Sequence, residues 1–174
     1  MLSIENSVVV IIDIQEKLVN AVGKYSPVDK ASRICNAANI LNIPLIVTEQ
    51  YPKGLGKTVA ELKLENAYCV EKTAFSAYED IKNKLESLNK KRVIIFGIEA
   101  HICVYQTICD LLANDYEVYF VKDCSASRNE YEFETGVELI KQFGAKITCT
   151  EIVLFEWLKS SKHPNFKEIQ ALIK

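Results

Sequence analysis

Val8-Val9-Val10-Ile11-Ile12-Asp13 is a run of five β-branched residues that ends on a carboxylate. A run that is apolar without alternation is typical of a strand buried on both faces of a parallel sheet. Further apolar runs predict strands at Pro44–Val47, Ala67–Val70, Arg92–Phe96, Val118–Val121 and Ala145–Cys149.

Amphipathic segments with apolar residues at helical spacing lie between these runs. They predict helices at Asp29–Leu41, Ala77–Asn89, Ile102–Asn114 and Glu130–Phe143, a short helix within Gly54–Leu64, and one or two helices in the tail. Repeated strand–helix units predict an α/β fold in which helices cover both faces of a parallel sheet. Ligands of such folds bind beyond the carboxyl ends of the strands, so the residues after each run are the first site candidates.

Length and composition predict a single domain over residues 1–174. The net charge is −2, from 21 basic and 23 acidic residues, so we expect neither nucleic-acid nor membrane partners. No apolar run approaches the roughly 20 residues that cross a bilayer, and no signal peptide is readable. Six cysteines without paired spacing predict reduced thiols in a cytoplasmic protein.

Cofactor motifs are incomplete in this chain. Gly56-Lys57-Thr58 matches the end of a phosphate-binding loop, but Tyr51 stands where that motif requires a glycine. Neither G-x-G-x-x-G after the first strand nor G-x-S-x-G occurs, which disfavours a dinucleotide cofactor and a serine nucleophile. His101 and His163 are the only histidines, and we expect no metal and no cofactor.

Three reactive side chains are predicted at the same edge of the sheet. Cys103 lies near the start of the helix after the fourth strand, where the helix dipole and a nearby cation would favour a thiolate. Asp13 ends the first strand and Lys72 follows the third. Each has a plainer alternative, namely a buried structural cysteine, a carboxylate that accepts loop N–H bonds, and a solvent-facing lysine. Their predicted convergence favours a catalytic site.

The order and spacing of several motifs resemble the isochorismatase-like cysteine hydrolases over nearly the whole chain, and specifically their small single-domain subgroup of unassigned substrate. The motifs are Val8–Gln15, Thr48–Gly56, Glu71–Ser76, Phe96–Val104, Asp123–Arg128 and Lys162-His163-Pro164.

The resemblance implies a three-layer α/β/α, Rossmann-like fold with a six-stranded parallel sheet. It also implies a catalytic triad of Asp13, Lys72 and Cys103, and a cis peptide between Ile98 and Glu99. That bond would aim the Glu99 and Cys103 N–H groups at one oxyanion hole.

The mechanism implied by this triad is hydrolysis through a thiol-acyl intermediate. Lys72 and the helix end lower the thiol pKa, Asp13 accepts the thiol proton, and Cys103 attacks a carbonyl. Retention of the cysteine favours C–N bonds of small amide or carbamoyl-type substrates over a vinyl ether. No histidine follows the second strand, where nicotinamidases of this family hold a metal, so we expect a metal-independent enzyme.

The substrate pocket is expected to be lined from several loops. Its candidate residues are Gln15, Glu49, Tyr51, Phe75, Ile98 and Tyr105. Core packing is an equal alternative for Phe75 and Tyr105. The partner is then a small-molecule substrate.

Two other functions are alternatives, and the resemblance implies a homo-oligomer. A catalytically silent member could act as a binding or scaffold protein, and Cys103 could serve redox chemistry. Pairing with Cys109 within one helix is disfavoured by geometry. Family members are commonly homo-oligomers, and the tail around Phe155 and Trp157 is either a self-association surface or part of the core.

Overall fold

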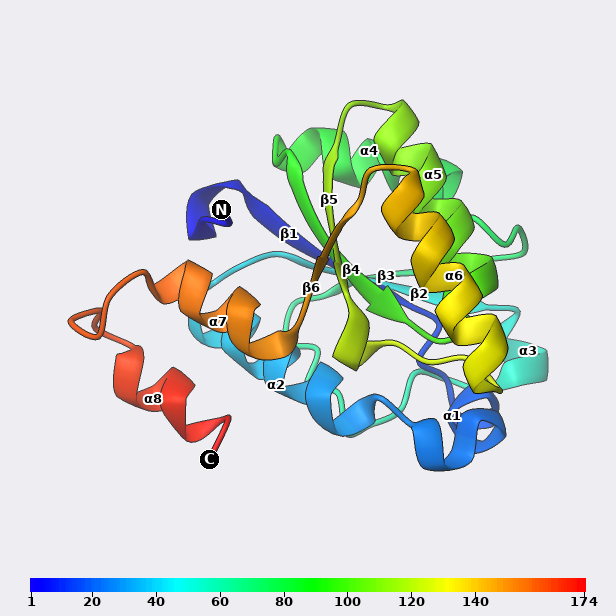
Figure 1. Ribbon diagram of the computed structural model, residues 1–174, viewed down its shortest axis with the longest axis horizontal. Helices are drawn as coiled ribbons and strands as arrows, with labels where there is room; N and C mark the ends of the chain where they lie inside the picture. The colour runs from blue at the N-terminus through cyan, green and yellow to red at the C-terminus, as the bar shows by residue number, and fades with distance from the viewer.

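The computed structural model describes residues 1–174 and contains one six-stranded sheet (Figure 1). The strands are β1 (Ser7–Ile12), β2 (Leu45–Gln50), β3 (Tyr68–Lys72), β4 (Arg92–Gly97), β5 (Glu117–Val121) and β6 (Lys146–Thr148). They lie in the order β3-β2-β1-β4-β5-β6, and every neighbouring pair is parallel. The predicted α/β fold with a parallel sheet is therefore confirmed.

Helices cover both faces of this sheet, which gives three layers (Figure 1). The longer helices are α1 (Glu16–Val22), α2 (Val28–Ile40), α4 (Tyr78–Leu88), α5 (Tyr105–Ala113), α6 (Glu130–Gln142) and α7 (Thr150–Leu158). Two short ones are α3 (Pro52–Leu55) and α8 (Phe166–Ala171). Helices α2, α7 and α8 pack on one face, and α4, α5 and α6 pack on the other.

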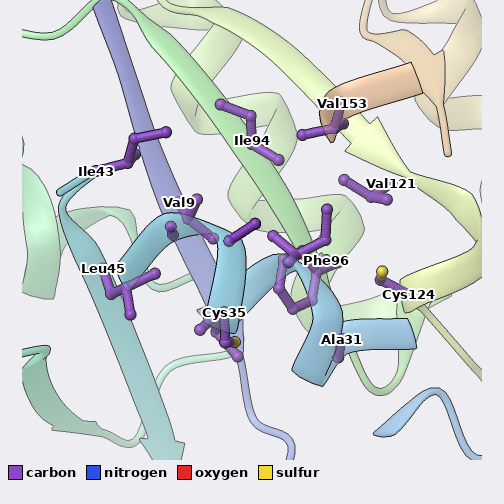
Figure 2. Close-up of a cluster of buried hydrophobic side chains, with 14 of the residues drawn as sticks. Val9, Ala31, Cys35, Ile43, Leu45, Ile94, Phe96, Val121, Cys124 and Val153 are labelled. Carbon is purple, nitrogen blue, oxygen red and sulfur yellow. The ribbon is translucent and has the colours of Figure 1, made fainter. Parts of the chain in front are cut away.

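Strand β1 explains why its apolar run does not alternate. Val9 and Ile11 enter the core under α2 and α7, whereas Val8, Val10 and Ile12 enter the core under α4 to α6. Figure 2 shows part of the first core, where side chains from α2, α7 and the central strands meet. Each large apolar side chain buried this way contributes about 1.5–3 kcal/mol relative to an exposed one.

Two strands extend further than their apolar runs predict. β2 continues to Gln50 and β3 continues to Lys72, although both ends are polar. These residues stay in the ladder because their backbones pair, Glu49 with Glu71 and Gln50 with Lys72. Helix α1 was not predicted from the sequence, since only Val22 of its residues is buried.

Helix α7 has one face in the core and one face outside it. Trp157 is buried, and its indole N–H donates to Ser7 Oγ at 3.2 Å. Ile152 and Phe155 are exposed on the opposite side. The core interpretation is therefore confirmed for Trp157, whereas self-association through the exposed face of α7 stays a prediction. No helix is long and apolar enough to cross a membrane.

Gly97 at the end of β4 is held against β1 with no room for a side chain. A Cβ atom placed there would lie 2.0 Å from the carbonyl oxygen of Ile12. The same oxygen accepts a hydrogen bond from the Ile98 N–H at 3.0 Å. The close approach of β1 and β4 therefore requires glycine at this position.

Gly97→Ala is expected to lower the free energy of unfolding by about 1–3 kcal/mol or more, because the methyl group forces the two strands apart. Urea denaturation followed by circular dichroism measures the change. Gly54→Ala is the matched control, since its methyl group would meet only the exposed ring of Tyr51, which can move. Equal stability of the Gly97 variant and wild type would contradict the conclusion that the close approach of β1 and β4 requires glycine.

Candidate active site

The carboxyl ends of the four strands β3, β2, β1 and β4 bring the predicted reactive residues together. The order of the sheet reverses between β1 and β4, which is where ligands of doubly wound folds bind. Asp13 follows β1, Lys72 ends β3, and Cys103 lies in the turn after β4. The register aligns Ile12 with both Thr48 and Gly97, and Gln50 with Lys72.

Asp13 and Lys72 form a buried ion pair. Lys72 Nζ lies 2.8 Å from Asp13 Oδ2, and neither side chain has any exposed area. The other carboxylate oxygen, Oδ1, accepts a hydrogen bond from Thr48 Oγ1 at 2.6 Å. A carboxylate in the interior remains charged only when it is compensated in this way.

The three protons of the Lys72 ammonium point to neutral oxygens. Nζ donates to Gln50 Oε1 at 2.7 Å, to the Ala74 carbonyl at 3.1 Å and to the Phe75 carbonyl at 3.0 Å. Its contact with Asp13 is therefore electrostatic, and Asp13 Oδ2 has no aligned hydrogen-bond donor. This oxygen has a free lone pair that can accept a proton from a third group.

Cys103 lies in η3 (Ala100–Val104), a turn of π-helix that leads into α5. Its side chain is buried, with 6% of the residue exposed. Burial and the nearby Asp13 carboxylate raise the pKa of the thiol to about 12, although Lys72 acts in the opposite direction. The predicted lowering of this pKa is therefore wrong. Desolvation and the carboxylate outweigh the cation, so the thiol is protonated at neutral pH.

The expected cis peptide between Ile98 and Glu99 is also wrong, because the chain contains no cis peptide bond. The reversal after β4 is made instead by Glu99, which has left-handed backbone angles (φ 59°, ψ 59°). The Glu99 N–H donates to no group of the protein. The Glu99 carbonyl accepts from Ile102 and Val104, and the Cys103 N–H between them does not donate to it.

Left-handed residues other than glycine gather at this edge of the sheet. Asp13 (φ 52°), Tyr51 (φ 37°) and Glu99 (φ 59°) directly follow or lie just beyond β1, β2 and β4. Such a conformation costs a side-chain-bearing residue roughly 1–2 kcal/mol. Strain of this kind clusters at functional sites, where the surrounding structure enforces it.

Two of the expected pocket residues hold a loop in place. Gln15 donates to the carbonyls of Gln50 and Gly56 and accepts from the Gln50 N–H, so its amide is fully used. Glu49 accepts from the Thr58 N–H, the Thr58 hydroxyl and Lys57 Nζ. Partial burial raises the pKa of Glu49, but these hydrogen bonds outweigh it and lower the pKa overall.

The other expected pocket residues lie in different environments: two are exposed and two pack against other side chains. Tyr51 and Phe75 are each 57% exposed, beside the turns that follow β2 and β3. Ile98 is fully buried in the core. Tyr105 packs edge to face against Phe143, with ring centroids 5.8 Å apart, which places it between α5 and α6. Its ring packs between these helices because Phe143, at the end of α6, offers an aromatic partner.

The larger cavities of the surface lie away from the thiol. A hollow of about 310 Å³ lies on the outer side of Lys72, between Tyr51, Pro52, Lys53, Thr73 and Asp80. Neither Asp13 nor Cys103 lines it. No three His, Cys, Asp or Glu side chains converge in an arrangement that could hold a metal ion.

Three positioning residues were given no individual role from the sequence, although Thr48 and Gln50 lie in a segment that it marked. Thr48 fixes Asp13, and Gln50 fixes Lys72. Thr107 is buried in α5, where its hydroxyl donates to the Cys103 carbonyl at 2.7 Å and accepts from the Ala77 N–H at 3.0 Å. Polar residues placed at the carboxyl end of a strand were the available signal for the first two. No sequence signal marked Thr107.

The chain is similar in sequence to proteins of one family. A family model described as Isochorismatase domain matches residues 7–152. Isochorismatase domain-containing protein 2 of Danio rerio is 41% identical, over 99% of this chain and 89% of that protein. Isochorismatase family protein 1A of Dictyostelium discoideum is 38% identical, over 98% of this chain and 87% of that protein.

Solved structures agree in fold. One titled as the MAR1 ribonuclease of Caenorhabditis elegans has a TM-score of 0.93 at 38% identity, covering 99% of this chain and 91% of that one. The Escherichia coli YcaC gene product, titled an octameric hydrolase of unknown specificity, has a TM-score of 0.87 at 21% identity, covering 98% and 94%. The second likeness shows a common fold only.

Lys72→Met is expected to lower the free energy of unfolding by about 3–5 kcal/mol, because it leaves the Asp13 carboxylate buried without its cation. Urea denaturation measures the change. The control is Lys82→Met, which removes the exposed partner of Glu79 and is expected to have little effect. A Lys72 variant as stable as the control would show that the pair does not support the fold.

Asp13→Asn is expected to lower the pKa of the Cys103 thiol, because the substitution removes a negative charge that raises it. The pH dependence of iodoacetamide labelling, read by peptide mass, measures this change. Wild-type Cys103 should label only well above the ordinary thiol range near pH 8.5, and the variant should label at lower pH. Cys69, exposed on β3, serves as the internal reference. Identical labelling profiles of Cys103 in wild type and Asp13→Asn would contradict the conclusion that Asp13 raises the pKa of the thiol.

Proposed function

The chain belongs to the isochorismatase domain family, an isochorismatase-like hydrolase family, and on this premise we propose that it is a metal-independent cysteine hydrolase of small amide or carbamoyl-type substrates. One observation carries the proposal. Asp13 Oδ2 lies against a lysine ammonium, lacks an aligned donor, and acts on the thiol of Cys103. A free carboxylate lone pair beside a protonated thiol supports general-base activation of a nucleophile.

The first half of the reaction transfers the acyl group to sulfur. Asp13 takes the thiol proton as the Cys103 sulfur attacks the carbonyl carbon, and a C–S bond forms. The Glu99 and Cys103 N–H groups hold the negative carbonyl oxygen of the tetrahedral intermediate. The intermediate collapses with cleavage of the C–N bond, and protonated Asp13 gives its proton to the leaving amine.

The second half consumes water. Asp13 removes a proton from a water molecule that attacks the thioester carbon. The C–S bond breaks, the acid leaves, and Asp13 returns the proton to the sulfur. The Lys72 ammonium lies 2.8 Å from the Asp13 carboxylate and compensates its negative charge. With a thiol pKa of about 12, a standing thiolate is scarce at neutral pH, so proton transfer must accompany the attack.

The burial of the thiol supports a small substrate. Cys103 is nearly inaccessible, and the larger hollows nearby do not reach it. Tyr51 and Phe75, exposed beside the site, are the proposed contacts for the rest of the substrate, and a homo-oligomer would cover them from outside. Gln15 and Glu49 would shape the pocket by holding the loop after β2, while Ile98 would support the turn after β4 from the core.

The Caenorhabditis elegans structure is named a ribonuclease, which would act on RNA. Nucleic-acid binding depends on cations that neutralise phosphates. Here the net charge is −2, Lys72 is enclosed, and Arg128 is paired with Glu99. These charges favour an uncharged C–N substrate over RNA.

Turnover is tested with a panel of small amides, ureas and carbamoyl compounds monitored for released ammonia or amine, and with a short RNA as a competing substrate. Cys103→Ser and Asp13→Asn are each expected to lower turnover by about 10²–10⁴-fold, because each removes one participant in proton transfer. Mass spectrometry of the wild-type protein is expected to find an acyl group on Cys103.

Cys109→Ser is the control, since this thiol lies in α5 beside Tyr105 and outside the proposed reaction. Full turnover in Asp13→Asn would overturn the mechanism. Wild-type protein that binds panel compounds and never acquires an acyl group would favour the scaffold alternative. Cleavage of RNA alone would replace the proposed substrate class.

A further inference from the structure

A second charge cluster lies beside the reactive residues, on the turn that follows β4. Arg128 Nε lies 2.8 Å from Glu99 Oε1. His101 Nδ1 lies 2.8 Å from Ser127 Oγ and 3.5 Å from Glu99 Oε2, and His101 Nε2 lies 3.7 Å from Glu132 Oε2. Glu99 Oε2 is buried without an aligned donor, so Arg128 is the closest cation to this carboxylate.

The backbone around Glu99 is hydrogen-bonded on both sides, and the Glu99 carbonyl is bonded too, but the Glu99 N–H is not. The Ile98 N–H donates to the Ile12 carbonyl at 3.0 Å, and the Ala100 N–H donates to the Ala126 carbonyl at 3.0 Å. The Glu99 N–H is free, and its φ of 59° is unfavourable for a residue with a side chain. Because this N–H has no hydrogen-bond partner of its own, contacts of the Glu99 side chain add to the restraint that the flanking backbone bonds place on the turn.

We propose that Arg128 is a positioning residue for the oxyanion hole: its ion pair with Glu99 holds the left-handed turn so that the Glu99 N–H stays aimed at the reacting carbonyl oxygen. This inference rests on the proposed acyl-transfer function. It assigns a role to a residue from the segment between β5 and α6, which contributes no group to the reaction itself.

The same segment is already joined to the turn by its backbone. The Ala126 N–H donates to the Gly97 carbonyl at 3.1 Å, and Ile98 pairs with Ala126 in a parallel bridge. Arg128 extends this connection by one side-chain contact. Its side chain is 55% exposed, so its removal leaves no buried cavity and threatens the fold little. Guanidinium geometry gives the contact a fixed direction that a single point charge does not.

Two reagents separate the oxyanion hole from the thiol. p-Nitrophenyl acetate acylates a cysteine through a tetrahedral oxyanion: the C–S bond forms, the C–O bond to the aryl group breaks, and p-nitrophenolate leaves as the thiol proton passes to Asp13. Iodoacetamide alkylates the same sulfur by displacement of iodide, with no oxyanion. The ratio of the acylation rate to the alkylation rate at Cys103 therefore reports on the oxyanion hole alone.

Arg128→Met is expected to slow acylation of Cys103 by about tenfold or more, because a loosened donor loses much of the 10²–10³-fold effect of an oxyanion-hole group. Alkylation by iodoacetamide should stay within twofold of wild type. Arg128→Lys should recover part of the acylation rate, since it retains the charge. Glu99→Gln, which removes the other half of the pair, should likewise lower the ratio of acylation to alkylation, with faster alkylation because the Glu99 carboxylate raises the pKa of the thiol. Arg33→Met, which breaks the Arg33–Asp29 pair on α2, is the matched control.

The outcomes distinguish the positioning role of Arg128 from the proposed hydrolase function. Equal acylation of wild type and Arg128→Met would overturn the positioning role and leave the hydrolase function intact. A parallel loss of acylation and alkylation would also overturn it, because it would indicate general disturbance of Cys103. Wild-type protein that is alkylated at Cys103 but never acylated there would overturn the proposed function itself.

Discussion

The buried ion pair between Asp13 and Lys72 is the constraint on which the rest of the site depends. Two charges enclosed in the interior are tolerated where they pair with each other and hydrogen bonds compensate the groups around them. That requirement accounts for Thr48 on Asp13, for Gln50 on Lys72, and for the two carbonyls of the β3–α4 loop that receive the ammonium protons. The pair therefore determines which polar residues continue β2 and β3 beyond their apolar runs.

The central strands were predictable because their residues face helices on both sides. Val8 to Ile12 show this without any alternation, and the order of strand and helix then implied a parallel sheet and a site at its carboxyl edge. Asp13, Lys72 and Cys103 could be named for the same reason. Polar strand ends such as Thr48 to Gln50 carried no apolar signal, so the strand boundaries there were placed too early.

The electrostatic state of the site was not predictable, because it depends on distance and burial. Sequence position suggested a cationic neighbour and a helix end for Cys103, both of which favour a thiolate. The fold buries the thiol beside the Asp13 carboxylate, and this raises its pKa. Similarly, the direction of the turn at Glu99 follows from its contact with Arg128 and from backbone bonds to Ala126, which are distant in sequence.

The high pKa of Cys103 also determines how the protein responds to oxidants. Peroxides react with thiolates, and the first product, a sulfenic acid, proceeds to irreversible acids when no second thiol resolves it. A thiol with a pKa of about 12 presents almost no thiolate in the resting state. In the folded chain this buried thiol is therefore a poor target for peroxides.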